Sequence, residues 1–139
     1  MPLKMNAVEL MAYLDEVFPQ VIDDFAVDRL AEMEVDLRLK VAERHLRPGG
    51  TVSGPSMFAL ADCSAYAIVL AMIGRQALAV TTSCGLDFMR KPEAGRDLIG
   101  KCRLLKLGRV LAVAEILIYS EGGDQPVARA NMTYSIPPR

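Results

Sequence analysis

The chain has 139 residues, of which 52% are hydrophobic, and its 16 Lys and Arg residues nearly balance its 17 Asp and Glu residues. This length and composition predict one folded domain, residues 1–139, and exclude a disordered chain. Because the net charge is only −1, there is no global basic field, and we do not expect nucleic acid as a partner.

The sequence gives little indication of a metal site, a disulfide framework or a membrane-spanning segment. The three cysteines, Cys63, Cys84 and Cys102, form no CxxC pair, and His45 is the only histidine. We therefore expect reduced thiols, no metal site and no cofactor. The first 16 residues carry acids early and lack a signal-peptide pattern, and the longest apolar stretch, residues 57–73, falls short of a membrane span. These features predict a soluble, cytoplasmic chain that does not enter a membrane.

The N-terminal third predicts a short helix followed by two strands. Asn6 followed by Glu9 is a capping arrangement, and apolar residues then recur at helical spacing until Pro19. Residues 25–31 and 34–42 are typical of strands. In the second, VDLRLKVAE, apolar residues alternate with charged ones, so one face is expected to be buried.

An apolar helix is predicted after a loop. The loop, residues 45–52 (HLRPGGTV), is marked by one proline and two glycines. The helix, residues 55–73, begins with Pro55, which suits a first helical position, and Gly74 would end it. Apolar residues lie on nearly all its sides, so we expect it to be surrounded by protein. Asp62 lies in its middle, where a carboxylate without partners would be costly.

Four strand-like segments complete the chain, residues 77–90, 97–107, 110–120 and 126–136. Their connections, KPEAGRD, KLGR and SEGGDQ, are rich in turn residues, and we expect all three to join neighbouring strands. The order of the elements indicates an α+β domain in which one curved antiparallel sheet wraps one central helix. Long edge strands in such a sheet invite pairing with a second copy.

Several segments together resemble a known family. GTVSGPSMFALAD, residues 50–62, resembles the GxxHGGxxxxLxD segment of the hotdog-fold acyl-CoA thioesterases, in the phenylacetate-pathway (PaaI-like) branch. TTSCGLDFMRKPEAG, LLKLGRVLAVAEILIYSEG and VARANMTYSIPP resemble the later strands of that family, so the resemblance covers about residues 30–138. It implies a hotdog fold, hydrolysis of an acyl-CoA to a free acid and CoA, and a homodimer or a dimer-of-dimers tetramer.

The resemblance also implies a catalytic site. In the family, a carboxylate on the central helix attacks the thioester or activates water, and the N–H of the first Gly of HGG polarises the thioester carbonyl. Matching the spacing implies that Asp62 is the carboxylate and that Gly54 supplies the N–H. A hydroxyl on the next strand assists in some relatives. Aligning on Phe88 and Gly95 implies Thr81, whereas aligning on the proline implies Thr82. We prefer Thr81 as the catalytic candidate, because Phe88 and Gly95 match together without a gap. We expect the site at a dimer interface, where the helix of one copy meets the strand of the other.

The chain departs from the family pattern around the glycine. Ser53 stands where the family usually has His, Pro55 replaces the second Gly, and Arg47 stands where some relatives carry a substrate-side Asn. These three and Thr82 are candidate substrate-binding residues. Four basic residues at strand ends and turns are candidates for binding the CoA phosphates: Arg90, Lys91, Lys106 and Arg109. The alternative interpretation is that they are ordinary solvent-exposed charges at turns.

Two other functions remain alternatives. A hydratase or dehydratase of acyl thioesters on this fold would usually pair a His with an acid, but His45 lies outside the helix, where we expect a structural role. A non-catalytic acyl-CoA binder or sensor would fit the departures from the family pattern, whereas the retained Asp62 favours an enzyme. The sequence does not decide whether the acyl group of the substrate is an aryl group or a short or medium chain.

Overall fold

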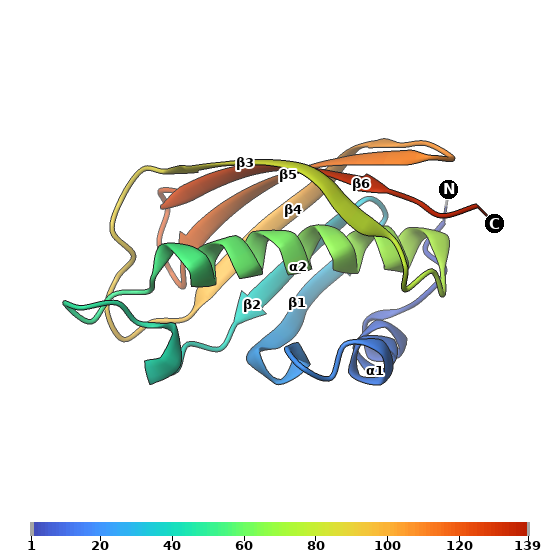
Figure 1. The fold of residues 1–139 in the computed structure, drawn as a ribbon. Helices are drawn as coiled ribbons and strands as arrows, with labels where there is room; N and C mark the ends of the chain where they lie inside the picture. The colour runs from blue at the N-terminus through green and yellow to red at the C-terminus, as the bar shows by residue number, and fades with distance from the viewer. Residues whose placement is uncertain (1, 139) are drawn as a thin grey trace.

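The computed structural model describes residues 2–138. A six-stranded antiparallel sheet curves around one long helix, α2, while the short helix α1 packs beside β1 and α2 (Figure 1). This is the α+β architecture that the hotdog resemblance implies. The elements are α1 Ala7–Val17, β1 Phe25–Ala31, β2 Glu34–Leu39, α2 Gly54–Ile73, β3 Val80–Phe88, β4 Leu98–Leu107, β5 Leu111–Ser120 and β6 Ala128–Ser135, with short 3-10 turns η1 Ile22–Asp24 and η2 Glu43–His45.

Helix α1 begins as the sequence predicts. Asn6 Oδ1 accepts a hydrogen bond from the Glu9 N–H at 2.8 Å, and Glu9 Oε1 accepts one from the Asn6 N–H at 3.0 Å. This reciprocal pair satisfies two of the helix's first N–H groups. One side of the helix packs against the rest of the fold through the buried residues Leu10, Tyr13 and Leu14.

Helix α2 is the core helix of the fold. It starts one residue earlier than predicted, at Gly54, and ends before Gly74, which has a φ of 95°. The apolar stretch 57–73 is part of the longer helix Gly54–Ile73, which is long and apolar enough to cross a membrane by length and composition alone. The prediction that the apolar segment is too short for a span is therefore wrong. Burial distinguishes a core helix from a membrane-spanning helix better than length does, and 67% of the most apolar window of α2 is buried inside the fold.

The strand order, β1-β2-β4-β5-β6-β3, corrects one expectation about the turns. KLGR and SEGGDQ join strands that pair with each other, as predicted. KPEAGRD does not: it leads from β3, at one edge of the sheet, to β4, which lies between β2 and β5. Turn-rich composition marks a change of chain direction but does not reveal which strands are hydrogen-bonded. Strand β3 pairs instead with β6, the last of the six strands.

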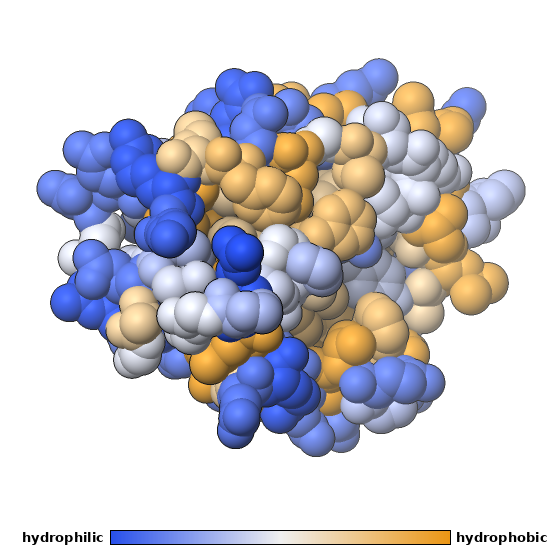
Figure 2. Space-filling view, turned by 60° about the vertical axis from the view of Figure 1, so that its left-hand side comes forward, coloured by the Kyte–Doolittle hydropathy of each residue, from blue (hydrophilic) through white to orange (hydrophobic). Residues whose placement is uncertain are grey.

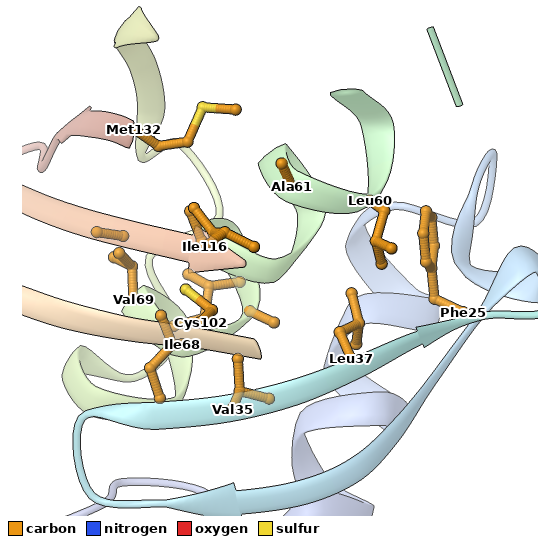
Figure 3. Close-up of a cluster of buried hydrophobic side chains, with 14 of the residues drawn as sticks. Phe25, Val35, Leu37, Leu60, Ala61, Ile68, Val69, Cys102, Ile116 and Met132 are labelled. Atoms are coloured by element: carbon orange, nitrogen blue, oxygen red, sulfur yellow. The ribbon is translucent and has the colours of Figure 1, made fainter. Parts of the chain in front are cut away.

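The core lies between the inner face of the sheet and α2. Figure 3 shows Val35, Ile116 and Met132, from three different strands, gathered with Ile68 of the helix. All four side chains are at most 1% exposed. This core fixes α2 against the sheet and so fixes the position of each residue along the helix.

Candidate active site

The Asp62 carboxylate has two hydroxyl partners, which explains how an apolar helix accommodates an acid. Thr81 Oγ1 donates a hydrogen bond to Asp62 Oδ1 at 2.5 Å. Tyr134 OH donates to the same oxygen at 2.7 Å and to the backbone carbonyl oxygen of Asp62 at 3.0 Å. Hydrogen bonds to an ionised group are the stronger kind, and here they offset the hydration that a half-buried carboxylate loses.

The pairing of β3 with β6 brings these hydroxyls together. Thr81 lies directly opposite Tyr134 in the ladder, so both side chains project from the same face of the sheet, toward α2. A β-bulge follows Thr81 and leaves Thr82 as the extra residue. The Thr82 hydroxyl donates to a backbone carbonyl of β6 at 3.3 Å. Of the two threonines that the sequence leaves open, Thr81 contacts the carboxylate. The contact between Asp62 and Thr81 lies within one chain, and the expectation that the site lies at a dimer interface stays a prediction.

A cavity of about 300 Å³ opens beside Asp62. Tyr66 packs edge-to-face against Phe18 and stacks on Tyr134, each with ring centroids 6.1 Å apart. The cavity sets apolar side chains beside one carboxylate and several hydroxyls, so it suits a ligand that joins an apolar part to a polar reactive group near that acid. The lining residues are Val17, Phe18, Asp62, Cys63, Tyr66, Ala77, Ala79, Val80, Thr81 and Tyr134.

The other ionisable groups of the cavity keep their protons. Burial and the negative charge of Asp62 raise the pKa of the Tyr134 hydroxyl far above its ordinary value. Burial, reinforced by the charge of Asp62, raises the pKa of Cys63 to about 12. The thiolate is the nucleophilic form of cysteine, so Cys63 is a packing residue beside the carboxylate.

Candidate residues from the sequence also gather at a second cavity of about 570 Å³, at the N-terminus of α2. Figure 2 turns this end of the molecule forward and shows apolar surface bordered by groups of hydrophilic side chains. The candidates that line the cavity are Arg47, Ser53, Gly54, Pro55, Arg90 and Lys91.

The Gly54 N–H is a free donor at this second cavity. Pro55 has no N–H, the Ser56 N–H is bound by Ser53 Oγ at 3.3 Å, and the Met57 N–H is bound by the Ser53 carbonyl at 3.1 Å. Within residues 2–138, no group accepts a hydrogen bond from the Gly54 N–H. The helix therefore presents one N–H, together with the positive end of its dipole, to a negatively charged ligand atom. Ser53 is the N-cap residue that leaves this donor free.

Gly54 also allows close packing at the start of α2. It does not have a positive φ, so its backbone angle does not call for glycine. A Cβ at this position would lie 3.2 Å from Cζ of Phe88, which is tighter than ordinary contact. The missing side chain therefore lets the Phe88 ring lie against the start of α2.

The two cavities are separate within one chain. Gly54 and Asp62 are eight residues apart on α2, roughly 12 Å along its axis. Arg90 follows the end of β3, whereas Lys106 and Arg109 lie at the β4–β5 turn, at the end of the sheet where β3 begins. The structure thus places Lys106 and Arg109 in neither cavity, although Arg109 lines a third one beside the C-terminal segment.

His45 holds the loop that precedes α2. Its Nδ1 accepts from the Ala42 N–H at 2.9 Å, its Nε2 lies 3.3 Å from Asp24 Oδ2, and its carbonyl accepts from the Ser53 N–H at 2.8 Å. Although burial opposes the change, hydrogen bonds from Arg44 and His45 lower the pKa of Asp24. These contacts give the histidine a structural role. Within residues 2–138, no three His, Cys, Asp or Glu side chains are grouped so as to hold a metal ion.

Tyr134 contacts Asp62 but is not among the candidate residues named from the sequence. The signal was present, because alternate residues of VARANMTYS are apolar and place Tyr134 on the inner face of its strand. A buried tyrosine hydroxyl normally has a hydrogen-bond partner, and the single acid of the core helix was the available one.

Comparisons with known proteins identify the family of the chain. Residues 49–127, which include all of α2, match the family model of the thioesterase superfamily. The chain is 31% identical over 108 residues to a "putative esterase" of Pseudomonas aeruginosa, covering 77% of this chain and 78% of that protein.

Solved structures give the same result. A "putative thioesterase" of Silicibacter sp. TM1040 is 67% identical, with a TM-score of 0.93 over 99% of this chain and 96% of that one. A mutant of the phenylacetic acid degradation protein PaaI of Thermus thermophilus is 27% identical, with a TM-score of 0.72 over 86% of this chain and 99% of that one. The chain therefore belongs to the thioesterase superfamily, as a thioester hydrolase of the PaaI-like hotdog type.

Proposed function

We propose that this chain hydrolyses acyl-CoA thioesters to the free acid and CoA, with Asp62 as general base or nucleophile. The observation that carries the proposal is the Asp62 carboxylate, held by two hydroxyls at the wall of a cavity that combines apolar and polar side chains. The unpaired cysteines fit an enzyme of the reducing cytoplasm.

Either mechanism needs only the Asp62 carboxylate, water and the thioester. As a base, Asp62 takes a proton from water while the water oxygen adds to the carbonyl carbon; the C–S bond then breaks, and the thiolate leaves with that proton. As a nucleophile, a carboxylate oxygen adds to the carbonyl carbon, the thiolate leaves, and water hydrolyses the mixed anhydride. In each case the carbonyl oxygen gains negative charge, which an N–H donor stabilises.

That donor would come from a second copy. An oxyanion donor must lie about 3 Å from the carbonyl oxygen, and the attacking atom about as close to the carbonyl carbon. Gly54 and Asp62 of one chain are too far apart along α2 to meet these conditions together. The Gly54 N–H of a partner chain would meet them if its N-terminal cavity adjoined the Asp62 cavity.

Strand β3 is the edge through which two copies would pair. It has β6 on one side and an open edge on the other, with Val80 exposed near one end and Phe88 near the other. Antiparallel pairing of two β3 strands about a two-fold axis would set the Phe88 end of one chain beside the Val80 end of the other. This contact would join the Gly54 cavity of one copy to the Asp62 cavity of its partner.

The same pairing would gather the basic candidates. Arg90 and Lys91 at the end of one β3 would approach Lys106 and Arg109 of the partner, at the beginning of the other β3. Arg47 already lines the Gly54 cavity. Cations at the mouth of the joined site suit the CoA phosphates.

Free-thiol release from a panel of short, medium and aryl acyl-CoAs tests the function. Asp62→Asn keeps the size of the side chain and an oxygen for both hydroxyls, so we expect a folded protein that loses about a hundredfold or more in kcat. Asp36→Asn, at a partly buried acid of β2 that pairs with Arg29, is the matched control and should retain the wild-type rate.

Three results would contradict the proposal. Equal rates in wild type and Asp62→Asn would place the chemistry elsewhere. Acyl-CoA binding without turnover by the wild type would leave the non-catalytic sensor as the better description. An equal loss in Asp36→Asn would mean that the effect is not specific to the site.

A further inference from the structure

We infer that Thr81 and Tyr134 together hold one oxygen of the Asp62 carboxylate, Oδ1, and so assign the other oxygen, Oδ2, as the one that meets water or the thioester. The inference rests on the catalytic role proposed for Asp62. It adds Tyr134 to the site as a positioning residue.

The donors to the carboxylate are distributed unequally. Both hydroxyls reach Oδ1, Thr81 at 2.5 Å and Tyr134 at 2.7 Å. Across the described part of the chain, residues 2–138, no side chain or backbone group donates a hydrogen bond to Oδ2. The lone pairs of Oδ2 are therefore available, whereas those of Oδ1 are engaged.

An unrestrained carboxylate would not keep this distinction. The last torsion of an aspartate side chain is broad and nearly two-fold, so its two oxygens exchange places easily. Two donors on one oxygen, from two different strands, fix the plane of the group. Holding the reacting atom in its attack geometry before the substrate arrives is a principal source of catalytic rate.

The Tyr134 hydroxyl is well suited to this task. Its ring is 3% exposed and stacks on Tyr66, whose own hydroxyl is tied to the Ala77 carbonyl at 2.7 Å. The raised pKa of Tyr134 keeps its proton in place throughout the neutral range. The hydroxyl therefore acts as a donor under all working conditions and cannot compete with Asp62 as a base.

The register between β3 and β6 fixes the positions of the two hydroxyl donors relative to each other. Thr81 and Tyr134 are directly opposite each other across β3 and β6, so their hydroxyls are spaced by the ladder itself. A slip of one residue would turn one of the two side chains to the outer face.

Steady-state kinetics of Tyr134→Phe, Thr81→Val and the double variant test the inference. Each single variant loses one hydrogen bond to a charged group, so we expect kcat to fall about 10- to 100-fold with KM changed less than about threefold, and the double variant to lose more. Ser64→Ala is the control. It removes a fully buried hydroxyl of α2 that donates to the Leu60 carbonyl at 2.6 Å and faces the sheet, so kcat should stay at the wild-type value.

A second readout does not depend on turnover. In crystal structures of Tyr134→Phe and of the double variant, we expect the Asp62 carboxylate to turn away from its wild-type plane or to occupy two conformations. The inference is overturned if the carboxylate keeps its wild-type plane in the double variant. It is also overturned if kcat of Tyr134→Phe stays within about threefold of wild type, if only KM changes, or if Ser64→Ala loses as much activity. If the wild type lacks activity on every acyl-CoA, the proposed function fails, and the crystal structures alone decide whether the two hydroxyls hold the carboxylate.

Discussion

Gly100 of β4 offers the most direct test of how closely α2 lies on the sheet. A Cβ added there would meet Ser64 Oγ at 2.7 Å and Leu60 Cγ at 3.3 Å. Ordinary contact begins at 3.4 Å, so the oxygen would have to retreat by about 0.7 Å. Ser64 is fully buried and bonded to the Leu60 carbonyl, and it has little room to move.

We therefore expect Gly100→Ala to destabilise the protein. Overpacking of a core costs about 1–3 kcal/mol, and replacing a strand glycine returns about 0.5–1 kcal/mol of it through the unfolded chain. The net loss is about 1–2 kcal/mol. For a chain of this length, that corresponds to a fall of about 3–10 °C in Tm.

Urea unfolding and thermal melts at one fixed protein concentration provide the measurement, because association would make Tm depend on concentration. The double variant Gly100→Ala/Ser64→Ala removes the atom responsible for the closest contact and should recover part of the loss. A Gly100→Ala variant as stable as wild type, or a double variant with strictly additive effects, would refute the conclusion that Ser64 Oγ leaves no room for a side chain at Gly100.

Three further predictions follow from other contacts. The pKa of Asp24 is lowered in the folded state, so the stability that its carboxylate contributes is present above its ordinary pKa and is lost as the pH falls through the lowered value. Urea titrations between about pH 6 and pH 3 should therefore show a larger loss of stability in wild type than in Asp24→Asn. In a Cys84→Ser variant both remaining thiols have raised pKa values, so neither should react quickly with a disulfide reagent at pH 8 until the protein is unfolded; rapid labelling of the native variant would contradict this. Inactive Asp62→Asn and Gly54→Pro chains, refolded together, should recover about a quarter of wild-type activity if each site combines two chains, and none if each site lies within one chain.

The sequence was informative about the elements and about the acid. Asn6 and Glu9 indicate the start of α1, and the apolar run around Asp62 indicates a buried helix, because capping and burial are local properties of the chain. The alternation in β2 likewise predicts one buried face, and Val35 and Leu37 are both fully buried.

Pairing between distant segments was harder to predict. KPEAGRD has the composition of a hairpin turn, yet it leads away from β3 without pairing it to β4. The sequence favours Thr81 over Thr82 only through the match of Phe88 and Gly95. The physical difference between the two is the β-bulge, which depends on the partner strand. The Tyr134 contact to Asp62 spans 72 residues of sequence and depends on both of these features.

The sheet order also bears on how the chain assembles during synthesis. Strand β3 is made before β4, β5 and β6, but the strand it pairs with inside residues 2–138 is β6, which emerges last. Nascent chains fold from the N-terminus as they emerge, so β1, β2, β4 and β5 can form a sheet against α2 while β3 still has no neighbour. Thr81 and Tyr134 reach Asp62 only when β6 docks. A chain synthesised only as far as β5 lacks Tyr134 and lacks the strand against which β3 places Thr81, so the Asp62 carboxylate gains its two hydroxyl partners only when the last strand is in place.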